Sequence, residues 1–347
     1  MSHFVGLDVG KRLTSVCVMD AAGTIVQEAE VETSPKALLA FLRGRGRRYR
    51  RIGLEAGDMA PWLYHGLVKA GLPAIPIDAL HAHRALSVRR NKTDRNDAQG
   101  IAELMRTSSY KSVHVKSDEA RSLRALLTAR GALLEKRRDL EMVIRSILRG
   151  FGLKLPLRAP RTFDADALAF ARRDATLWGT LEPLFAARDA LGEQARLLER
   201  RVHEAARRDP VCRRLMTAPG VGEITALTFR ATVDEPRRFS SSRSVGVHFG
   251  LTPRTFRSAT TETRGGISHW GDAATRKVLF MAALTVFKMK QADTPLHRWA
   301  RSLAGRMKAK KAVVAVARKL AVVMHRMWVD GTDFGEIGSG GVAMTHP

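Results

Sequence analysis

The stretch Lys92-Thr-Asp-Arg-Asn-Asp-Ala-Gln99 contains two carboxylates, Asp94 and Asp97, three residues apart at the predicted start of a helix. Side chains at that spacing point to the same face of a helix. Two like charges held this close repel each other, and a folded protein tolerates them where a cation lies between them or water separates them. The stretch therefore predicts one half of a cation site.

Two further acids end predicted strands nearer the amino terminus. Asp8 closes the apolar run Phe4-Val-Gly-Leu-Asp8, and Glu55 closes the run Ile52-Gly-Leu-Glu55. Four carboxylates from two strand ends and one helix start can converge on a pair of hard divalent cations, and Mg²⁺ prefers such oxygen ligands. We therefore expect a magnesium site formed by these four acids.

Each of these acids also has a simpler explanation when it is taken alone. Asp94 could cap its helix, and Asp97 could pair with Arg90 or Arg95 at the surface. Taken together, the four acids favour the metal site.

The charge of the chain points to a polyanionic partner. Lysine and arginine number 59 against 34 aspartate and glutamate, which gives a formal net charge of +25 over 347 residues. Nucleic acid is the expected partner of such a charge. A membrane is not expected, because no apolar run reaches the roughly 18 residues of a spanning helix and no signal peptide is visible. The two cysteines, Cys17 and Cys212, are too few for a zinc site and fit a reducing, cytoplasmic compartment.

Residues 1–110 alternate between predicted strands and helices. The expected elements are strands 3–8, 14–19 and 24–31, a helix that Ser34 and Pro35 start and Arg43 ends, a strand that Glu55 ends, a helix over 60–70 and a strand over 72–77. This order is that of an α/β domain of the RNase H-like kind, which gathers acids at its central strand ends.

A run of arginines lies between the third and fourth predicted strands, where we expect a loop. Its members are Arg43, Arg45, Arg47, Arg48, Arg50 and Arg51. A charge run is usually a solvated segment. In a chain this basic we favour contact with nucleic-acid phosphates, and Lys92 is a further candidate for such contact.

Residues 111–208 are predicted to be largely helical. One long helix runs from Ser117 to Phe151, prolines 156 and 160 interrupt it, and a second helical segment runs from Asp164 to Arg208. The two amphipathic segments can form an antiparallel hairpin within one chain or a coiled-coil arm for dimerisation. Dimerisation is favoured, since such a hairpin buries little core by itself.

Residues 209–332 are predicted to form a compact helical domain, followed by a flexible tail over 333–347. Met216-Thr-Ala-Pro-Gly-Val-Gly222 has the form of a helix-hairpin-helix turn, in which Gly220 and Gly222 let backbone N–H groups approach a phosphate. A tight connection between two helices is the alternative.

A hydroxyl-rich stretch over 239–276 contains Ser258, which follows a short predicted turn. The basic and polar side chains around it are Arg254, Arg257, Arg264, Ser268, His269 and Arg276. A serine ionises too weakly to attack a phosphodiester unaided, so cations or a base must assist it. By composition alone, Ser258 is more often a loop hydroxyl than a nucleophile.

Several motifs occur in a fixed order along the chain. They are Gly-Leu-Asp8-Val-Gly, Leu-Glu55-Ala-Gly, Lys-Thr-Asp94-Arg-Asn-Asp97-Ala, Pro-Gly-Val-Gly222, Phe-Gly-Leu-Thr-Pro-Arg254, Ser258 and Gly-Gly-Ile-Ser268-His-Trp-Gly-Asp272. In this combination the chain resembles the IS110 family of insertion-sequence transposases, which are related to the Piv-type DNA invertases. The resemblance extends from Asp8 to about Trp328.

The resemblance implies a RuvC-like domain in which Asp8, Glu55, Asp94 and Asp97 bind Mg²⁺, a helical arm for oligomerisation, and a transposase domain in which Ser258 is the nucleophile. The chain departs from the family pattern at Ala259, where glycine is usual, and at His269, where lysine is usual. Neither difference removes the nucleophile.

The resemblance further implies DNA strand cleavage and rejoining through a phosphoserine intermediate, with a noncoding bridge RNA that pairs with donor and target DNA. It also implies a dimer or tetramer in which the acids and the serine come from different subunits. Two alternatives remain open: a Mg²⁺-dependent, RuvC-like endonuclease that uses water, and a nucleic-acid-binding protein without enzymatic activity.

Overall fold

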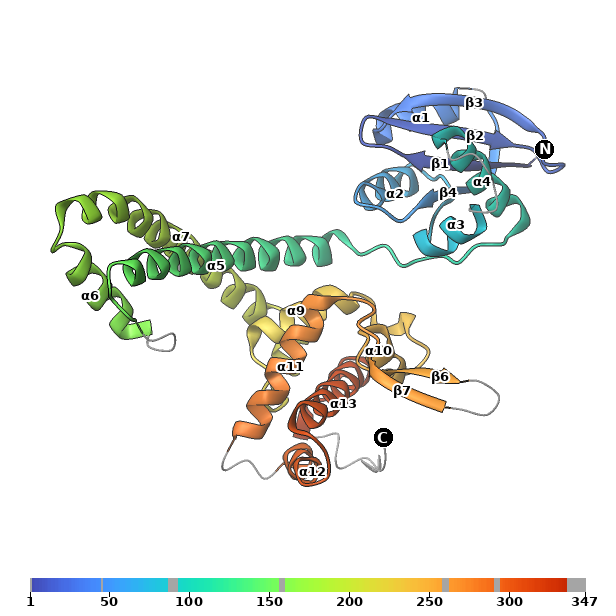
Figure 1. Ribbon diagram of the computed structural model, residues 1–347. Coiled ribbons are helices and arrows are strands. Elements are labelled where there is room, and N and C mark those ends of the chain that lie inside the picture. Colours follow the sequence, from blue (N-terminus) through green and yellow to red (C-terminus); the bar gives the residue numbers. More distant parts are fainter. Residues whose placement is uncertain are drawn as a thin grey trace. The chain divides into compact units, whose positions relative to one another are not determined.

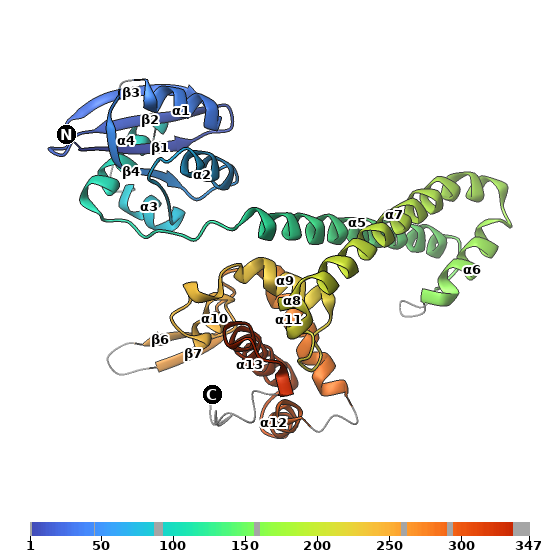
Figure 2. The ribbon, with the colours of Figure 1, turned by 180° about the vertical axis from the view of Figure 1, so that it is seen from behind.

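A computed structural model describes residues 2–44, 46–86, 93–155, 160–257, 262–289 and 294–335 (Figures 1 and 2). The chain folds into two compact units, Met1–Lys116 and Ser117–Pro347. Each unit is described by itself below. None of the described helices is both long and apolar enough to cross a membrane.

A five-stranded sheet forms the centre of the first unit, in the order β3-β2-β1-β4-β5. The strands are β1 (Ser2–Val9), β2 (Leu13–Met19), β3 (Ile25–Glu32), β4 (Arg48–Glu55) and β5 (Ala74–Ile77). The first three strands pair in antiparallel fashion, whereas β4 is parallel to β1 and β5 is parallel to β4. The five strands predicted from the sequence are therefore all present, and the mixed α/β architecture is confirmed.

Helices α1 (Pro35–Arg43) and α2 (Ala60–Lys69) cover one face of this sheet. Ser34 caps α1 by accepting a hydrogen bond from the amide of Ala37, as its position before Pro35 predicts. The core between these helices and the sheet consists of Val5, Leu7, Val16, Val18, Leu38, Leu42, Ile52, Leu54, Leu63 and Leu67. Alternate residues of β1 and β4 supply this core, so the residues between them face the opposite side.

Helix α4 (Asp94–Thr107) lies on that opposite face, across β1, β2 and β4 (Figure 1). Its backbone comes so close to β1 that a Cβ atom at Gly6 would lie 2.0 Å from the carbonyl oxygen of Ala98. A Cβ at Gly53 on β4 would lie 2.7 Å from Cγ of Met105. A side chain at Gly6 would collide with the α4 backbone, whereas one at Gly53 would displace the side chains of Met105 and Ile101.

The arginine run differs from the predicted loop. Strand β4 begins at Arg48, and Arg51 pairs with Phe4 on β1 across a register shift. The guanidinium group of Arg51 donates to the carbonyl oxygen of Met105 at 2.7 Å and to Oγ of Ser108 at 2.6 Å. Backbone pairing with β1 and these contacts hold the charged residues in a strand, which their composition did not indicate.

The second unit begins with a helical hairpin. Helix α5 (Asp118–Gly150), capped by the Ser117 side chain, packs against α7 (Ala175–Arg208) in antiparallel fashion. The predicted second segment is divided in two, because α6 (Pro160–Ala171) ends before Asp174, whose side chain caps α7. The two segments form a hairpin within one chain, and their predicted role in dimerisation stays a prediction.

Two arginines, Arg130 and Arg137, interrupt the apolar seam of α5. Arg130 forms an ion pair with Glu199 of α7, and the side chain of Arg137 lies against Gly192. Apolar contacts resume near the tip, where the buried residues are Ile144, Leu148, Ala167, Ala171, Leu177, Leu181 and Phe185.

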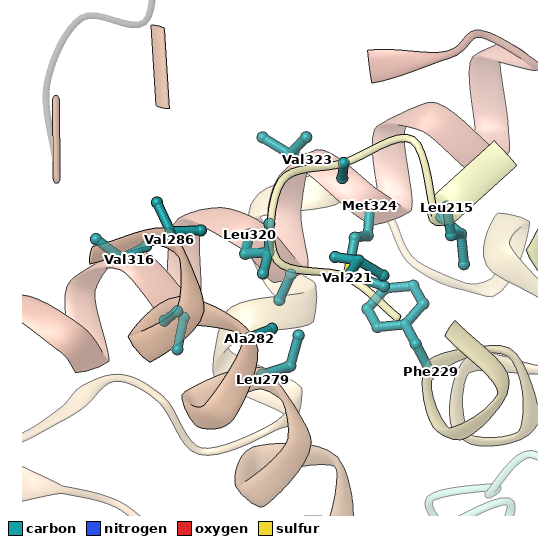
Figure 3. Close-up of a cluster of buried hydrophobic side chains, with 14 of the residues drawn as sticks. Leu215, Val221, Phe229, Leu279, Ala282, Val286, Val316, Leu320, Val323 and Met324 are labelled. Atoms are coloured by element: carbon teal, nitrogen blue, oxygen red, sulfur yellow. The ribbon is translucent and has the colours of Figure 1, made fainter. Parts of the chain in front are cut away.

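The remainder of the second unit is mainly helical. Its helices are α8 (Pro210–Leu215), α9 (Glu223–Val233), α10 (Ser242–His248), α11 (Ala273–Lys288), α12 (Pro295–Ala304) and α13 (Ala309–Asp330). Figure 3 shows their core, which includes Leu215, Val221, Phe229, Leu279, Leu320 and Met324. Val202 of α7 is buried in the same core and Leu123 of α5 packs against it, so the base of the arm and the helical domain fold as one body.

A two-stranded antiparallel sheet interrupts these helices and was not predicted. It consists of β6 (Pro253–Arg257) and β7 (Glu262–Ile267), with Pro253 opposite Ile267 and Phe256 opposite Thr263. The β-branched residues of this hydroxyl-rich stretch suit a strand, although the charges among them hide the alternation.

We predict that Gly6→Ala destabilises the first unit by about 1–3 kcal/mol, because the new methyl group must push the α4 backbone away from β1. Hydrogen exchange of β1 and α4 amides in the full chain measures this effect. Gly57→Ala is the matched control, since its Cβ would meet nothing within 4 Å. Unchanged protection in Gly6→Ala would show that the close contact does not exist.

Candidate active site

Asp8 and Glu55 lie at the carboxyl ends of two neighbouring parallel strands. Leu7 of β1 pairs with Leu54 of β4, so the two acids that follow them come at the same level of the sheet. Asp8 lies two residues after Gly6, and Glu55 lies two residues after Gly53. Because side chains alternate along a strand, both acids project on the face that α4 covers. Both are half-buried.

Asp94 and Asp97 lie in the first turn of α4, on the side of the helix that faces the sheet. Asp94 comes one turn before Ala98, which contacts Gly6, and Asp97 comes one turn before Ile101, which contacts Gly53. Asp94 is exposed and Asp97 is half-buried.

The direction of α4 places its first turn near the strand ends. Near the start of β1, Phe4 clusters with Met105, and further along the strand Gly6 contacts Ala98. The helix therefore runs opposite to β1, and its amino-terminal end lies toward the end of the strand that holds Asp8. All four acids thus share one face and one end of the sheet.

The structure tests two of the three simpler explanations for the α4 acids. Thr93 caps the helix by accepting a hydrogen bond from the amide of Asn96 at 3.2 Å, so Asp94 is not the cap. Arg95 forms an ion pair with Glu28 of β3, and this hydrogen bond lowers the pKa of Glu28. The other suggested partner, Arg90, lies outside the described residues.

The chemistry of the four carboxylates suits a hard divalent cation, which takes oxygen ligands. The distances between these carboxylates do not by themselves identify a metal site. Within the described ranges, no three histidine, cysteine, aspartate or glutamate side chains lie close enough together to hold a metal ion. The residues therefore fit magnesium in donor type, and the magnesium site itself stays a prediction.

The arginines predicted to contact phosphate divide into two groups. Arg43 donates to the carbonyl oxygen of Ala70 at 2.6 Å, Arg47 donates to the Gln27 side chain, and Arg51 fastens β4 to α4 as described above. These three contribute to the fold. Arg48 and Arg50 are exposed, whereas Arg45 and Lys92 lie outside the described residues.

The glycines of the predicted helix-hairpin-helix turn have different roles. Gly220 has a φ of +77°, and a Cβ there would lie 2.4 Å from the carbonyl oxygen of Ala282 on α11. The absence of a side chain at Gly220 therefore lets this turn pack closely against α11. Gly222 is exposed at the start of α9, where no side chain caps the helix. The acid that follows it, Glu223, pairs with His203 of α7.

Ser258 lies outside the described residues, as do residues 259–261 and the side chains of Arg257 and Arg264. The two strands next to it are described. Strand β6 ends at Arg257, and β7 begins at Glu262, which pairs with Arg257. Arg254 donates to the carbonyl oxygen of Ser268 at 3.1 Å and so connects the two ends of this hairpin.

The segment after β7 is held by several backbone contacts. Arg276 donates to the carbonyl oxygens of Phe249 at 3.2 Å, Trp270 at 2.7 Å and Gly271 at 3.0 Å. His269 is exposed and adopts a φ of +58°, which is uncommon for a residue with a side chain. Arg276 therefore stabilises this loop through its side chain, in addition to any contact with nucleic acid.

A buried polar group that the sequence did not single out anchors the same loop. Asp272 caps α11 by accepting from the amide of Thr275 at 2.6 Å, and it forms an ion pair with Arg124 of α5. Thr275 also bonds Thr232 of α9 at 2.8 Å. An aspartate directly before a predicted helix was the available signal for the cap; nothing in the sequence pairs it with Arg124.

The electrostatics of this group favour its ionised form. Burial raises the pKa of Asp272, but hydrogen bonds from Arg124 and Thr275 outweigh it, so the pKa is lowered below its ordinary value of 3.8. The base of the arm is thereby tied to the loop that follows β7.

Two family models match the chain. Residues 5–152 match that of the DEDD transposases of IS110, described as transposase, and residues 212–298 match the transposase IS116/IS110/IS902 family. The transposase for insertion sequence element IS1111A of Coxiella burnetii is 28% identical over 330 residues, which cover 92% of this chain and 88% of that protein. A probable family 20 transposase of Pseudomonas aeruginosa is 30% identical over 243 residues, 68% of this chain and 72% of its own length.

Among solved structures, that of Thermus thermophilus RuvC matches 32% of this chain and 99% of its own length, at 14% identity and a TM-score of 0.25.

We predict that Asp272→Asn lowers the stability of the second unit by about 1 kcal/mol at pH 7, because it removes a charged hydrogen bond to Arg124 that solvent partly screens. The folded pKa is lowered, so this contribution is complete above the unfolded pKa near 3.8 and is lost as the pH falls through the folded value. Urea unfolding of both proteins between pH 7 and pH 3 measures the difference. Asp139→Asn, at an exposed pair with Lys136, should change little.

Proposed function

Because the chain belongs to the IS116/IS110/IS902 family of insertion-sequence transposases, we propose that it cleaves and rejoins DNA strands through a serine nucleophile assisted by magnesium. One observation supports this most strongly. Asp8, Glu55, Asp94 and Asp97 come from three separate elements and project at one end of one face of the sheet.

These four carboxylates would hold the magnesium ions. When bound there, Mg²⁺ supplies positive charge to a DNA phosphate and offsets the repulsion among the acids. Without a cation, carboxylates so placed repel one another, so closure of the site would depend on the bound ion. Arg95 and Gln99 both bond Glu28 of β3 and keep the acid-bearing end of α4 in place.

Ser258 would perform the transfer itself. Its Oγ atom attacks the phosphorus, a phosphoserine bond forms, one P–O bond of the DNA breaks, and the proton of the serine passes to the oxygen of the leaving strand. A free hydroxyl of another strand then attacks the phosphoserine and restores the serine. The phosphodiester energy is conserved in the covalent bond, so no ATP is needed; the sequence contains no Walker-type loop.

The proposal extends to the partners of the protein. A net charge of +25 suits binding of donor DNA, target DNA and a structured guide RNA, with base pairing supplying the sequence specificity. We also propose that the protein acts as a dimer or tetramer. The helical hairpin α5–α7 is the candidate for the contact between subunits.

We predict that wild-type protein, incubated with Mg²⁺ and labelled DNA from the ends of its element, forms a protein–DNA adduct that survives denaturation. Ser258→Ala should lose the adduct and slow strand cleavage by about 1,000-fold or more, because the attacking atom is gone. Ser302→Ala removes a hydroxyl from α12 that only bonds the carbonyl oxygen of Trp299, and should retain both.

The two alternatives give different results in this assay. If Ser258→Ala cuts at the wild-type rate without an adduct, the protein is a RuvC-like endonuclease that uses water. If neither protein cuts and Asp94→Asn changes nothing, it is a nucleic-acid-binding protein.

We predict that Mg²⁺ stabilises the first unit at constant ionic strength, by about 2.7 kcal/mol at a concentration 100 times its dissociation constant. Asp97→Asn should lose most of this effect, and in EDTA it should be at least as stable as wild type, because one repelling charge is removed. Thermal unfolding with and without Mg²⁺ measures both. Asp118→Asn also changes an acid in the first turn of a helix, α5, and should respond as wild type does. An undiminished response in Asp97→Asn would contradict the site.

A further inference from the structure

Trp270 is the most exposed large apolar side chain among the described residues, with 63% of its surface accessible. It follows His269 and precedes Gly271, in the segment between β7 and α11. An indole contributes a large apolar area, and leaving it in water forgoes the stabilisation that its burial would give. None of the described aromatic rings or cationic groups stacks on it.

The backbone that carries this indole is held rigidly. A Cβ at Gly250 would lie 2.3 Å from the carbonyl oxygen of Trp270, and one at Gly271 would lie 2.1 Å from that of His248. Both glycines have positive φ values, of +65° and +75°. Two chain segments therefore cross in direct backbone contact beneath the tryptophan. The hydrogen bond from Arg276 to the Trp270 carbonyl, at 2.7 Å, fixes the same point from α11.

The charge around Trp270 is positive. Among the described side chains of residues 263–276, Arg276 is the cation and Asp272 is the acid, whereas the side chains of Glu262 and Arg264 lie outside the described residues. Asp272 is paired with Arg124 and with the start of α11, so its charge is already compensated. Arg254, which bonds the Ser268 carbonyl, is a further exposed cation beside this segment. A rigidly held, exposed aromatic ring with Arg254 and Arg276 beside its backbone resembles the arrangement with which proteins bind unpaired nucleotides.

We propose that Trp270 stacks on an unpaired base of the DNA strand that the protein processes, while the neighbouring cations contact the phosphates on either side. This inference deepens the proposed function and rests on it for the identity of the strand. Stacking on an indole accepts any base, so Trp270 is a positioning residue: it fixes a strand beside the β6–β7 hairpin without selecting its sequence.

A second copy of the chain is the other occupant that an exposed tryptophan could have. The surrounding charge argues against it, since the same cations would face one another across an interface between copies, and like charges repel. The measurements below separate the two.

The test compares a single-stranded oligomer of 20 thymidines with an abasic oligomer of the same length and charge, by fluorescence anisotropy on the full-length protein. Wild type should bind the thymidine strand about 5- to 150-fold more tightly than the abasic strand, which corresponds to stacking of one base. Trp270→Ala should lose this preference and keep its affinity for the abasic strand. Trp270→Phe should retain a large part of it.

Trp62→Ala is the matched control. Trp62 is also exposed, to 42%, but lies on α2 of the first unit, and its removal should leave the base preference intact. Thermal unfolding and light scattering of each variant report on folding and on the number of subunits. Because no strand is cut in this assay, failure of the Ser258 mechanism does not affect it.

An unchanged base preference in Trp270→Ala overturns the proposal. So does an equal loss of affinity for both strands. A change in the number of subunits with the preference intact assigns Trp270 to an interface between copies. A preference seen only with an oligomer of 20 uridines, and not with thymidines, would overturn the assignment to DNA.

Discussion

The close contact between α4 and the sheet is the constraint on which the first unit depends. Gly6 allows the helix backbone to lie directly on β1, Gly53 leaves room for the Met105 and Ile101 side chains on β4, and Thr93 and Glu28 fix the amino-terminal end of the helix. The acids of α4 acquire their position from this contact together with the bonds at the start of the helix. The placement of the candidate site is therefore a consequence of how the helix packs on the sheet.

Much of this arrangement was predictable from local pattern. The strand ends at Asp8 and Glu55 follow from apolar runs, and α1 and α5 follow from their serine caps. The contact of α4 with Gly6 was not, because nothing in the sequence states which helix a strand glycine will meet. The length of strand β4 was underestimated for a related reason. The composition of Arg48 to Arg51 is typical of a solvated loop, and only their pairing with β1 identifies them as a strand. The β6–β7 hairpin and the break before Asp174 were missed because polar residues there conceal the local signal.

Arginine has two uses in this protein, and composition does not separate them. Arg51, Arg124 and Arg276 each bond groups within the fold, and the contacts of Arg276 with three carbonyl oxygens hold the loop beside the β6–β7 hairpin. A guanidinium group has five donors in a fixed plane, which suits such multiple contacts better than an ammonium group does. Guanidinium groups held in such bonds are less free to reach a phosphate, although those bonded to neutral oxygens keep their charge.

Because α5 is long, its amino-terminal turns can transmit movement as well as stabilise the fold. Thirty-three residues of helix extend for about 50 Å, and the first turns of this rod are embedded in the same core as α9 and α11. If the helix is rigid, a tilt of a few degrees near Arg124 displaces its carboxyl-terminal end by several ångströms. A force on that end is likewise transmitted to the amino-terminal turns. A partner that binds the far end of the arm is thus connected, through the Arg124–Asp272 ion pair, to the segment that contains Trp270.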